Sequence, residues 1–184
     1  MGHTLKLAFV AWVLATGGAM AQTPPSPPPS QEGLIFRPPE DFASWNAAGN
    51  DSYYTAEFRL KSERQGPASR VLTFQAFRDQ TVRQPAAYNA EQLEYRRKFC
   101  PDARIEPVSA TTENGFPTEI SLIVCPKTEK NGQPRYEFVK SVQGATIFLF
   151  VDYTLNAEPN AAQRQAVIDY LGTVGLCGKT DGKC

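Results

Sequence analysis

Two apolar segments joined at Gln143-Gly144 constrain the fold of this chain more than any other part of the sequence. In residues 135–142, side chains of different polarity alternate, whereas residues 147–151 are apolar without interruption. A repeat of two residues is typical of a half-buried strand, and a glycine between two such segments favours a hairpin turn with a positive backbone angle φ. An uninterrupted apolar strand is typically covered on both faces. The sequence therefore predicts a β-hairpin that is central in a sheet.

Four further segments are predicted to be strands, because apolar and polar side chains alternate along them. They are residues 52–60, 70–78, 103–110 and 119–125. Asn114-Gly115, between the last two, is a strong signal for a turn between paired strands. Residues 34–42 are expected to form an extended lead-in, and residues 46–51 a loop.

Two helices are predicted from apolar side chains that recur every three or four residues, at residues 84–100 and 159–173. Pro85 suits the first position of a helix, and Pro101 ends the first of the two. The basic run 96–98 fits the C-terminal turn of that helix better than an anion site. In chain order the elements read ββ-α-ββββ-α. This order predicts an α+β fold, with two helices packed on a mainly antiparallel sheet.

The first 21 residues have the pattern of an export signal. Lys6 precedes an apolar run at residues 7–14, and Ala19-Met20-Ala21 supplies the small residues of a cleavage site. Residues 1–21 are therefore interpreted as a secretory signal peptide, cut before Gln22. Because the apolar run is far shorter than the roughly 20 residues that span a bilayer, the mature chain is not expected to cross a membrane.

The exported part is predicted to contain one folded domain. Residues 22–33 include five prolines, which favour an extended tether rather than a packed core. Residues 34–177 have a suitable length for a single α+β domain. Residues 178–184 form a polar C-terminal tail.

All four cysteines, Cys100, Cys125, Cys177 and Cys184, lie after the predicted cleavage site. An even number in an oxidising compartment favours two disulfides. The preferred pairing joins Cys100 to Cys125, between a helix end and a strand, and Cys177 to Cys184, around a short loop. In the alternative, Cys184 is a tail thiol that pairs with another chain.

Several catalytic chemistries are excluded by the residues present. The chain has one histidine, His3, which lies in the predicted leader, so the exported part has no imidazole to serve as a base or a metal ligand. No C-x-x-C pair, Walker loop, dinucleotide motif or calcium loop occurs. We therefore expect no cofactor or metal and can assign no catalytic residue. A net charge near zero gives no bulk attraction to nucleic acid.

Carboxylate chemistry survives this exclusion. Glu57, Glu119, Glu137 and Asp152 lie in or beside predicted strands, so two of them could form an acid/base pair. The preferred interpretation places them at outward strand positions in solvated or salt-bridged pairs. Lys140 interrupts an apolar pattern and is expected to extend its ammonium group to water from a strand end. The alternative is a buried lysine with a lowered pKa.

Four aromatic side chains form a possible binding patch: Tyr53, Tyr54, Phe148 and Phe150. Core packing is the preferred role of the two phenylalanines. If no helix covers them, the four rings would make an exposed surface for a partner or an apolar ligand.

Several short signatures resemble a family of small secreted proteobacterial proteins of unknown function. They are Cys100-Pro101, Asn114-Gly115-Phe116-Pro117, Val124-Cys125-Pro126, residues 138–144 (FVKSVQG) and Leu176-Cys177. The resemblance implies export and a single disulfide-stabilised domain, and it supplies no catalytic residue. The order of elements is also similar to that of Mog1/PsbP-like folds.

Three functions remain open from the sequence. The first is a non-catalytic module of the bacterial envelope, periplasmic or secreted, that binds an envelope protein or a small apolar ligand. The second is a periplasmic hydrolase that uses paired carboxylates. The third is an assembly subunit linked to its partner through Cys184.

Overall fold

The computed structural model describes residues 32–63, 65–78 and 83–178. The predicted signal peptide and residues 22–31 of the predicted tether lie outside the described residues, as do residues 179–184. No helix in the described part of the chain is long and apolar enough to cross a membrane.

An antiparallel sheet of seven strands forms the body of the protein, in the order β2-β3-β4-β8-β7-β6-β5. Its strands are β2 (Phe42–Gly49), β3 (Tyr53–Leu60), β4 (Arg70–Arg78), β5 (Arg104–Glu113), β6 (Phe116–Cys125), β7 (Arg135–Gln143) and β8 (Ile147–Leu155). A short second sheet pairs β1 (Glu32–Ile35) with β9 (Gly175–Gly178), and a short 3-10 helix, η2 (Lys61–Glu63), follows β3. The α+β class predicted from the sequence is confirmed.

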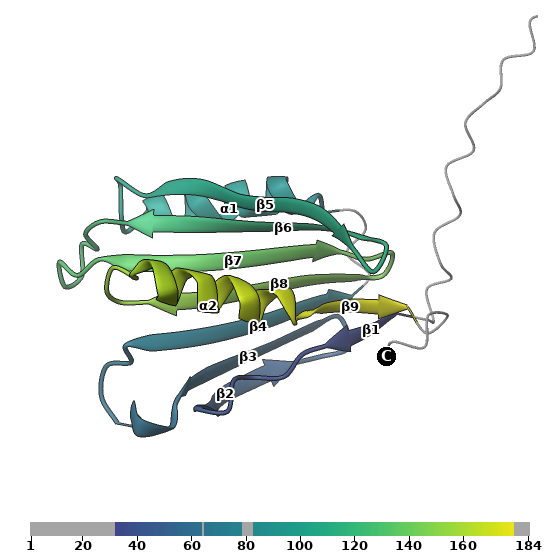
Figure 1. The fold of residues 1–184 in the computed structure, drawn as a ribbon, viewed down its shortest axis with the longest axis horizontal. Coiled ribbons are helices and arrows are strands. Elements are labelled where there is room, and N and C mark those ends of the chain that lie inside the picture. The colour runs from purple at the N-terminus through teal and green to yellow at the C-terminus, as the bar shows by residue number, and fades with distance from the viewer. Residues whose placement is uncertain (1–31, 64, 79–82, 179–184) are drawn as a thin grey trace, which may run out of the picture.

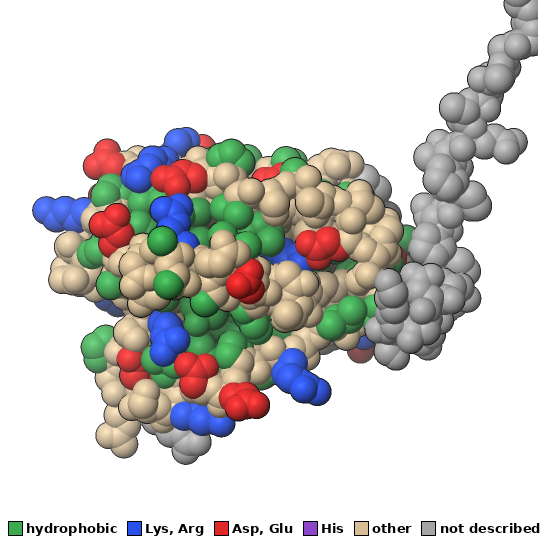
Figure 2. Space-filling view, in the orientation of Figure 1, with side chains coloured by type: hydrophobic (Ala, Val, Ile, Leu, Met, Phe, Trp, Pro, Cys, Tyr) green, Lys and Arg blue, Asp and Glu red, His purple; other side chains and the backbone are tan. Residues whose placement is uncertain are grey.

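Two helices cover opposite faces of the large sheet. In Figure 1, α2 (Ala161–Gly172) crosses the front of the sheet near β7 and β8, and α1 (Pro85–Arg97) lies behind β5 and β6. The space-filling view of the front face shows apolar side chains around α2, with charged side chains scattered among them (Figure 2). Strand β8 is the fourth of the seven strands, which confirms the prediction that the hairpin is central.

The apolar run of β8 supplies both cores because successive strand residues point to opposite faces. Leu149 and Val151 belong to the core beneath α2, together with Leu171. Phe148 and Phe150 belong to a smaller core beneath α1. The predicted burial of this strand on both faces is therefore confirmed.

Two strands at the N-terminal side were not predicted. Residues 42–49 form the edge strand β2, and it includes most of the segment that was expected to be a loop. Most of β2 is exposed, so it lacks the alternating polarity from which the other strands were recognised. Strand β1 begins at Glu32, so the last two residues assigned to the tether are in the folded part.

Gly144 is needed for a reason other than the predicted one. The described glycines with positive φ are Gly66, Gly115 and Gly132, so the expected positive φ at Gly144 is wrong. A Cβ atom at Gly144 would lie 2.6 Å from the carbonyl oxygen of Ile147 and 2.8 Å from a carboxylate oxygen of Glu32. The turn therefore needs glycine because other atoms approach its backbone closely.

The Glu32 carboxylate holds this turn in place. It accepts hydrogen bonds from the backbone N–H groups of Ala145, Thr146 and Ile147, and another from the Thr146 hydroxyl. A carboxylate that accepts several hydrogen bonds makes stronger contacts than a neutral acceptor. The first described strand is thus fixed to the central hairpin.

Gly144→Ala is expected to lower the free energy of unfolding by about 1–3 kcal/mol, because the new methyl group must displace backbone and the Glu32 carboxylate. Urea unfolding of the two proteins measures this difference. Gly172→Ala is the matched control, since a Cβ there meets nothing within 4 Å and alanine favours the helix. Equal stability of Gly144→Ala and the wild type would contradict the close approach.

Candidate functional site

The four aromatic residues of the predicted patch do not form one surface. Phe148 and Phe150 are each 2% exposed, and the ring centroid of Tyr88 on α1 lies 4.9 Å and 5.0 Å from theirs. Core packing, the preferred role of these two residues, is therefore confirmed, and they are not part of an exposed patch because α1 covers them. Tyr54 is exposed and Tyr53 is half-buried, and the two point to opposite faces of β3.

Glu137 and Asp152 come together beneath α1, in a buried charge cluster. Strand pairing places both on the α1 face, where Arg96 reaches between them from the last turn of the helix. Arg96 Nε donates to Glu137 Oε2 at 2.5 Å, and Arg96 Nη2 donates to Asp152 Oδ2 at 3.0 Å. Only 3% and 4% of the two acidic side chains is exposed. The expected outward position of these two residues is therefore wrong, although both are salt-bridged.

The other two candidate carboxylates have separate partners. Glu57 forms an ion pair with Arg59 at 2.7 Å on the same strand. Glu119 accepts hydrogen bonds from Asn89 at 3.1 Å and from Ser121 at 2.9 Å. Only Glu137 and Asp152, among the four, share a bridging side chain.

Arg135 connects the buried cluster to the surface. It is the first residue of β7, and its guanidinium group contacts the Glu137 carboxylate. Arg135 Nη2 donates to Thr154 Oγ1 at 3.3 Å, and that hydroxyl donates to Asp152 Oδ1 at 3.0 Å. Because 37% of the Arg135 side chain is exposed, this cation is shared between the cluster and the solvent.

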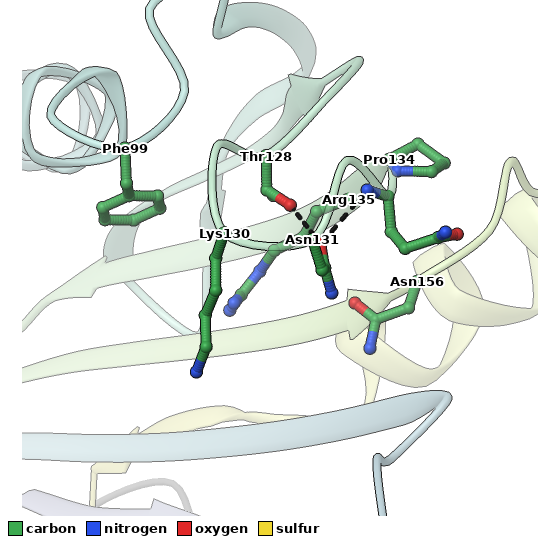
Figure 3. A pocket seen from close by; sticks show the side chains of 8 residues that line it. Phe99, Thr128, Lys130, Asn131, Pro134, Arg135 and Asn156 are labelled. Carbon is green, nitrogen blue, oxygen red and sulfur yellow. Dashed lines mark hydrogen bonds between the residues drawn. The ribbon is translucent and has the colours of Figure 1, made fainter.

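A cavity of about 410 Å³ opens beside Arg135. Its lining residues are Phe99, Thr128, Lys130, Asn131, Gln133, Pro134, Arg135 and Asn156. In Figure 3, the side chains of Lys130, Arg135 and Asn156 point to the same side, although they come from a loop, from β7 and from the segment after β8. The cavity lies where β7 begins and β8 ends, at the end of the large sheet opposite β1 and β9 (Figure 1).

The loop that forms most of the cavity wall is held by polar contacts. Asn131 Oδ1 accepts hydrogen bonds from the Thr128 hydroxyl and from the backbone N–H of Gln133 (Figure 3). Gly132 has a φ of 70°, which favours glycine in this tight turn. Glu129 N donates to the carbonyl oxygen of Phe99 at 3.1 Å, so the loop is also fixed to the end of α1.

A disulfide between Cys100 and Cys125 holds the end of α1 close to the end of β6, with a Cα–Cα distance of 6.0 Å. This pairing confirms the prediction from the sequence. Cys177 is also disulfide-bonded. Cys184 lies outside the described residues, so its pairing with Cys177, or with another chain, stays a prediction.

A second buried charge lies on the α2 face. Lys140 is 0% exposed, so its expected position at a strand end in water is wrong and the buried alternative holds. Its Nζ donates to Glu113 Oε2 at 2.5 Å and to the carbonyl oxygens of Leu171 and Val174 at 2.8 Å and 2.7 Å. Burial lowers the pKa of Lys140, and Glu113 opposes that shift. With these contacts, Lys140 caps the C-terminal end of α2.

Burial and the neighbouring charge of Asp152 raise the pKa of Glu137 from 4.5 to about 7, although Arg96 and Arg135 act in the opposite direction. The folded protein thus binds this proton more tightly than the unfolded chain does. The resulting stabilisation is fully present below about pH 4.5 and is lost as the pH rises through about 7.

The free energy of unfolding of the wild type is therefore expected to include a contribution that falls between about pH 5 and about pH 8. Glu137→Gln removes the titrating group, so this part of the pH dependence should be missing from the variant. Urea unfolding of both proteins at the two pH values tests this. The same pH dependence in both proteins would show that Glu137 does not titrate in this range.

The two carboxylates of the cluster could be identified as candidates from the sequence, but the arginines that bind them could not. Arg96 follows Asn89 and Leu93 on the buried face of α1, at the spacing of that face, so its position on the face was the available signal. No comparable signal marks Arg135 and Lys130, because the sequence does not indicate where a side chain at the start of a strand or in a loop points. No group of three or more metal-ligating side chains occurs among the described residues.

Comparison with known proteins gives little further information. No family model matches the chain, and no curated protein matches it. Among solved structures, one similar chain is LpqN, a protein involved in cell envelope biogenesis of Mycobacterium tuberculosis. It is 12% identical, with a TM-score of 0.38, and the alignment covers 79% of this chain and 83% of that chain. A likeness at this level carries no argument about function, and the predicted resemblances to secreted proteobacterial proteins and to Mog1/PsbP-like folds are not confirmed.

Proposed function

We propose that this chain is a non-catalytic binding module that works outside the cytoplasm and takes a small molecule into the cavity beside Arg135. The observation that carries the proposal is the convergence of Lys130, Arg135 and Asn156 on a cavity that also contains the ring of Phe99. Ligand sites combine an apolar wall with a few polar groups that converge on the ligand. The volume of about 410 Å³ suits a small molecule.

The state of the two buried carboxylates favours binding over hydrolysis. A carboxylate pair that cleaves a glycosidic bond lies on both sides of that bond, with the carboxylates roughly 5–9.5 Å apart. Here the guanidinium group of Arg96 occupies the space between Glu137 and Asp152. Because α1 also covers them, a substrate would have to displace Arg96 to reach either carboxylate.

Two features support a location outside the cytoplasm. The Cys100–Cys125 disulfide is typical of proteins in an oxidising compartment. The leader predicted at residues 1–21 would direct the chain there. A periplasmic or secreted envelope protein is consistent with both features.

A thermal-shift screen tests the proposed function without assuming the chemistry of the ligand. The screen uses a library of anionic, cationic and neutral small molecules, and we expect some of them to raise the Tm of the wild type. Gln133→Trp, which places a large ring at the cavity wall, should lose these shifts. Thr112→Trp, at an exposed position of β5, is the matched control and should keep them.

Two results would contradict the proposed function. In the first, no compound stabilises the wild type, or every active compound stabilises Gln133→Trp equally. In the second, mass spectrometry detects conversion of a stabilising compound into a product by the wild type, which would show that the protein is catalytic.

A further inference from the structure

We infer that the ligand is a small organic anion, with a carboxylate or phosphate attached to an apolar group, and that Glu137 competes with it for Arg135, so that binding is accompanied by proton uptake. This inference rests on the proposed function, because it names the ligand class and the regulation of the same cavity.

The charge of the lining residues indicates an anion. Among the residues that the structure describes, Lys130 and Arg135 line the cavity together with three amide side chains, and none of the lining side chains is acidic. Three other cavities each combine an arginine with an acidic residue in their linings: Arg70 with Asp41, Arg78 with Asp51, and Arg37 with Glu40. The cavity beside Arg135 therefore differs from these three by an excess of positive charge.

The apolar residues of the cavity wall indicate that the ligand also has an apolar group. Phe99 and Pro134 supply carbon surface to the same cavity. An aromatic ring favours contact with another ring or with an apolar chain. The cavity thus fits an anionic head beside the two cations and an apolar group against Phe99.

Arg135 is the cation whose charge is divided between the ligand site and the cluster. All three guanidinium nitrogens of Arg96 have partners within the protein, on Glu137, Gln92 and Asp152, and only 11% of its side chain is exposed. Arg135 also contacts Glu137, but it lines the cavity and is far more exposed. A bound anion would therefore meet Arg135 and not Arg96.

Competition for Arg135 couples the ligand to a proton. The charged groups that face Glu137 are Arg96 from α1, Asp152 from β8 and Arg135 from its own strand. When an anion binds Arg135, it weakens the attraction that keeps Glu137 ionised, so Glu137 takes up a proton from solvent more readily. The pKa of Glu137, raised to about 7 by burial and Asp152, places this exchange near neutral pH.

The sign of the coupling is fixed by this exchange. Above about pH 7, Glu137 is ionised and holds Arg135, and below it the protonated carboxyl leaves the guanidinium charge to the ligand. Affinity for the anion therefore falls as the pH rises. Linkage to one proton limits the change to about tenfold per pH unit.

Isothermal titration calorimetry with phenylacetate tests the inference, because this carboxylate stays ionised between about pH 6 and about pH 8. We expect the wild-type Kd to be at least about threefold higher at the upper pH, within the one-proton limit. Titrations in two buffers of different ionisation enthalpy should show proton uptake on binding. This readout uses only the wild-type protein. Phenyl phosphate, titrated at one pH, distinguishes a phosphate from a carboxylate as the preferred head group.

Three variants test whether the pH-dependent binding of phenylacetate depends on Glu137 and on the cavity beside Arg135. Glu137→Gln should bind phenylacetate with a Kd that does not change with pH and that resembles the low-pH value of the wild type. Lys130→Ala should weaken binding at least about threefold at both pH values, because it removes a unit charge from the lining. Lys61→Ala, exposed in η2, is the charge-matched control and should bind as the wild type does.

Neutral 2-phenylethanol separates failure of the inference from failure of the proposed function. If it binds the cavity as well as phenylacetate does, or if the phenylacetate Kd is independent of pH in the wild type, the inference is wrong and the binding function stands. If phenylacetate, 2-phenylethanol and every compound of the screen fail to bind the cavity, both the inference and the proposed function are wrong.

Discussion

Arg96→Met is expected to lower the free energy of unfolding by about 3–5 kcal/mol, because it leaves two buried carboxylates without their shared cation. Methionine retains most of the length and apolar stem of the side chain, so the loss is mainly electrostatic. Arg135 can compensate only in part, since it contacts Glu137 from the surface side. Chemical denaturation at pH 8, where Glu137 is ionised, measures the full effect.

Two further variants determine whether the charges cause this loss. Arg97→Met, one residue further along the same helix, breaks an exposed ion pair with Glu94 and should cost less than about 1 kcal/mol. Arg96→Met combined with Glu137→Gln and Asp152→Asn removes the cluster, so it should recover much of the stability lost in Arg96→Met alone. A triple variant less stable than Arg96→Met would contradict an electrostatic origin.

Lys140→Met is expected to lower the free energy of unfolding by about 2–4 kcal/mol. The substitution leaves the carbonyl oxygens of Leu171 and Val174 without their lysine donor and Glu113 without its ion pair. The helix end would then lose its hydrogen bonds to the central hairpin and keep only its apolar packing. Hydrogen exchange should therefore show faster exchange in α2 of the variant than in α2 of the wild type, beyond the change in global stability.

Lys130→Met is the control for this prediction, because it removes an exposed lysine from a loop and should change stability by less than about 0.5 kcal/mol. Lys140→Met with Glu113→Gln tests the coupling between the two charges, and its loss should be smaller than the sum of the two single losses. If Lys140→Met unfolds at the same denaturant concentration as the wild type, Lys140 does not cap α2.

The central hairpin could be predicted from the sequence because an uninterrupted apolar run indicates a strand that is buried on both faces. The run at residues 147–151 is apolar on both faces, and the strand that it forms is buried beneath both helices. Strand β2 gave no such signal, because an exposed edge strand has no face that must be apolar. Its pairing with β3 is a property of the assembled sheet.

The candidate site was less predictable, because its residues are far apart in the sequence and come into contact only in the folded protein. The sequence pattern places Glu137 and Asp152 on strands, but their burial depends on α1, which is at least 40 residues away in sequence from Glu137. The sequence pattern places Arg135 at the start of a strand. That Arg135 contacts Glu137 and also lines the cavity depends on how the loop at residues 126–134 folds. The pattern of neighbouring residues in the sequence does not predict contacts between such distant residues.

An NMR titration of the 15N-labelled protein with phenylacetate at about pH 6 tests the proposed binding site most directly. We expect saturable shifts of the backbone amide signals of Phe99, of residues 128–135 except Pro134, and of Asn156, with smaller shifts elsewhere in the sheet. The cavity beside Arg135 is not the binding site if no signal shifts, or if the shifted signals belong to residues around Tyr53 and Tyr54 instead.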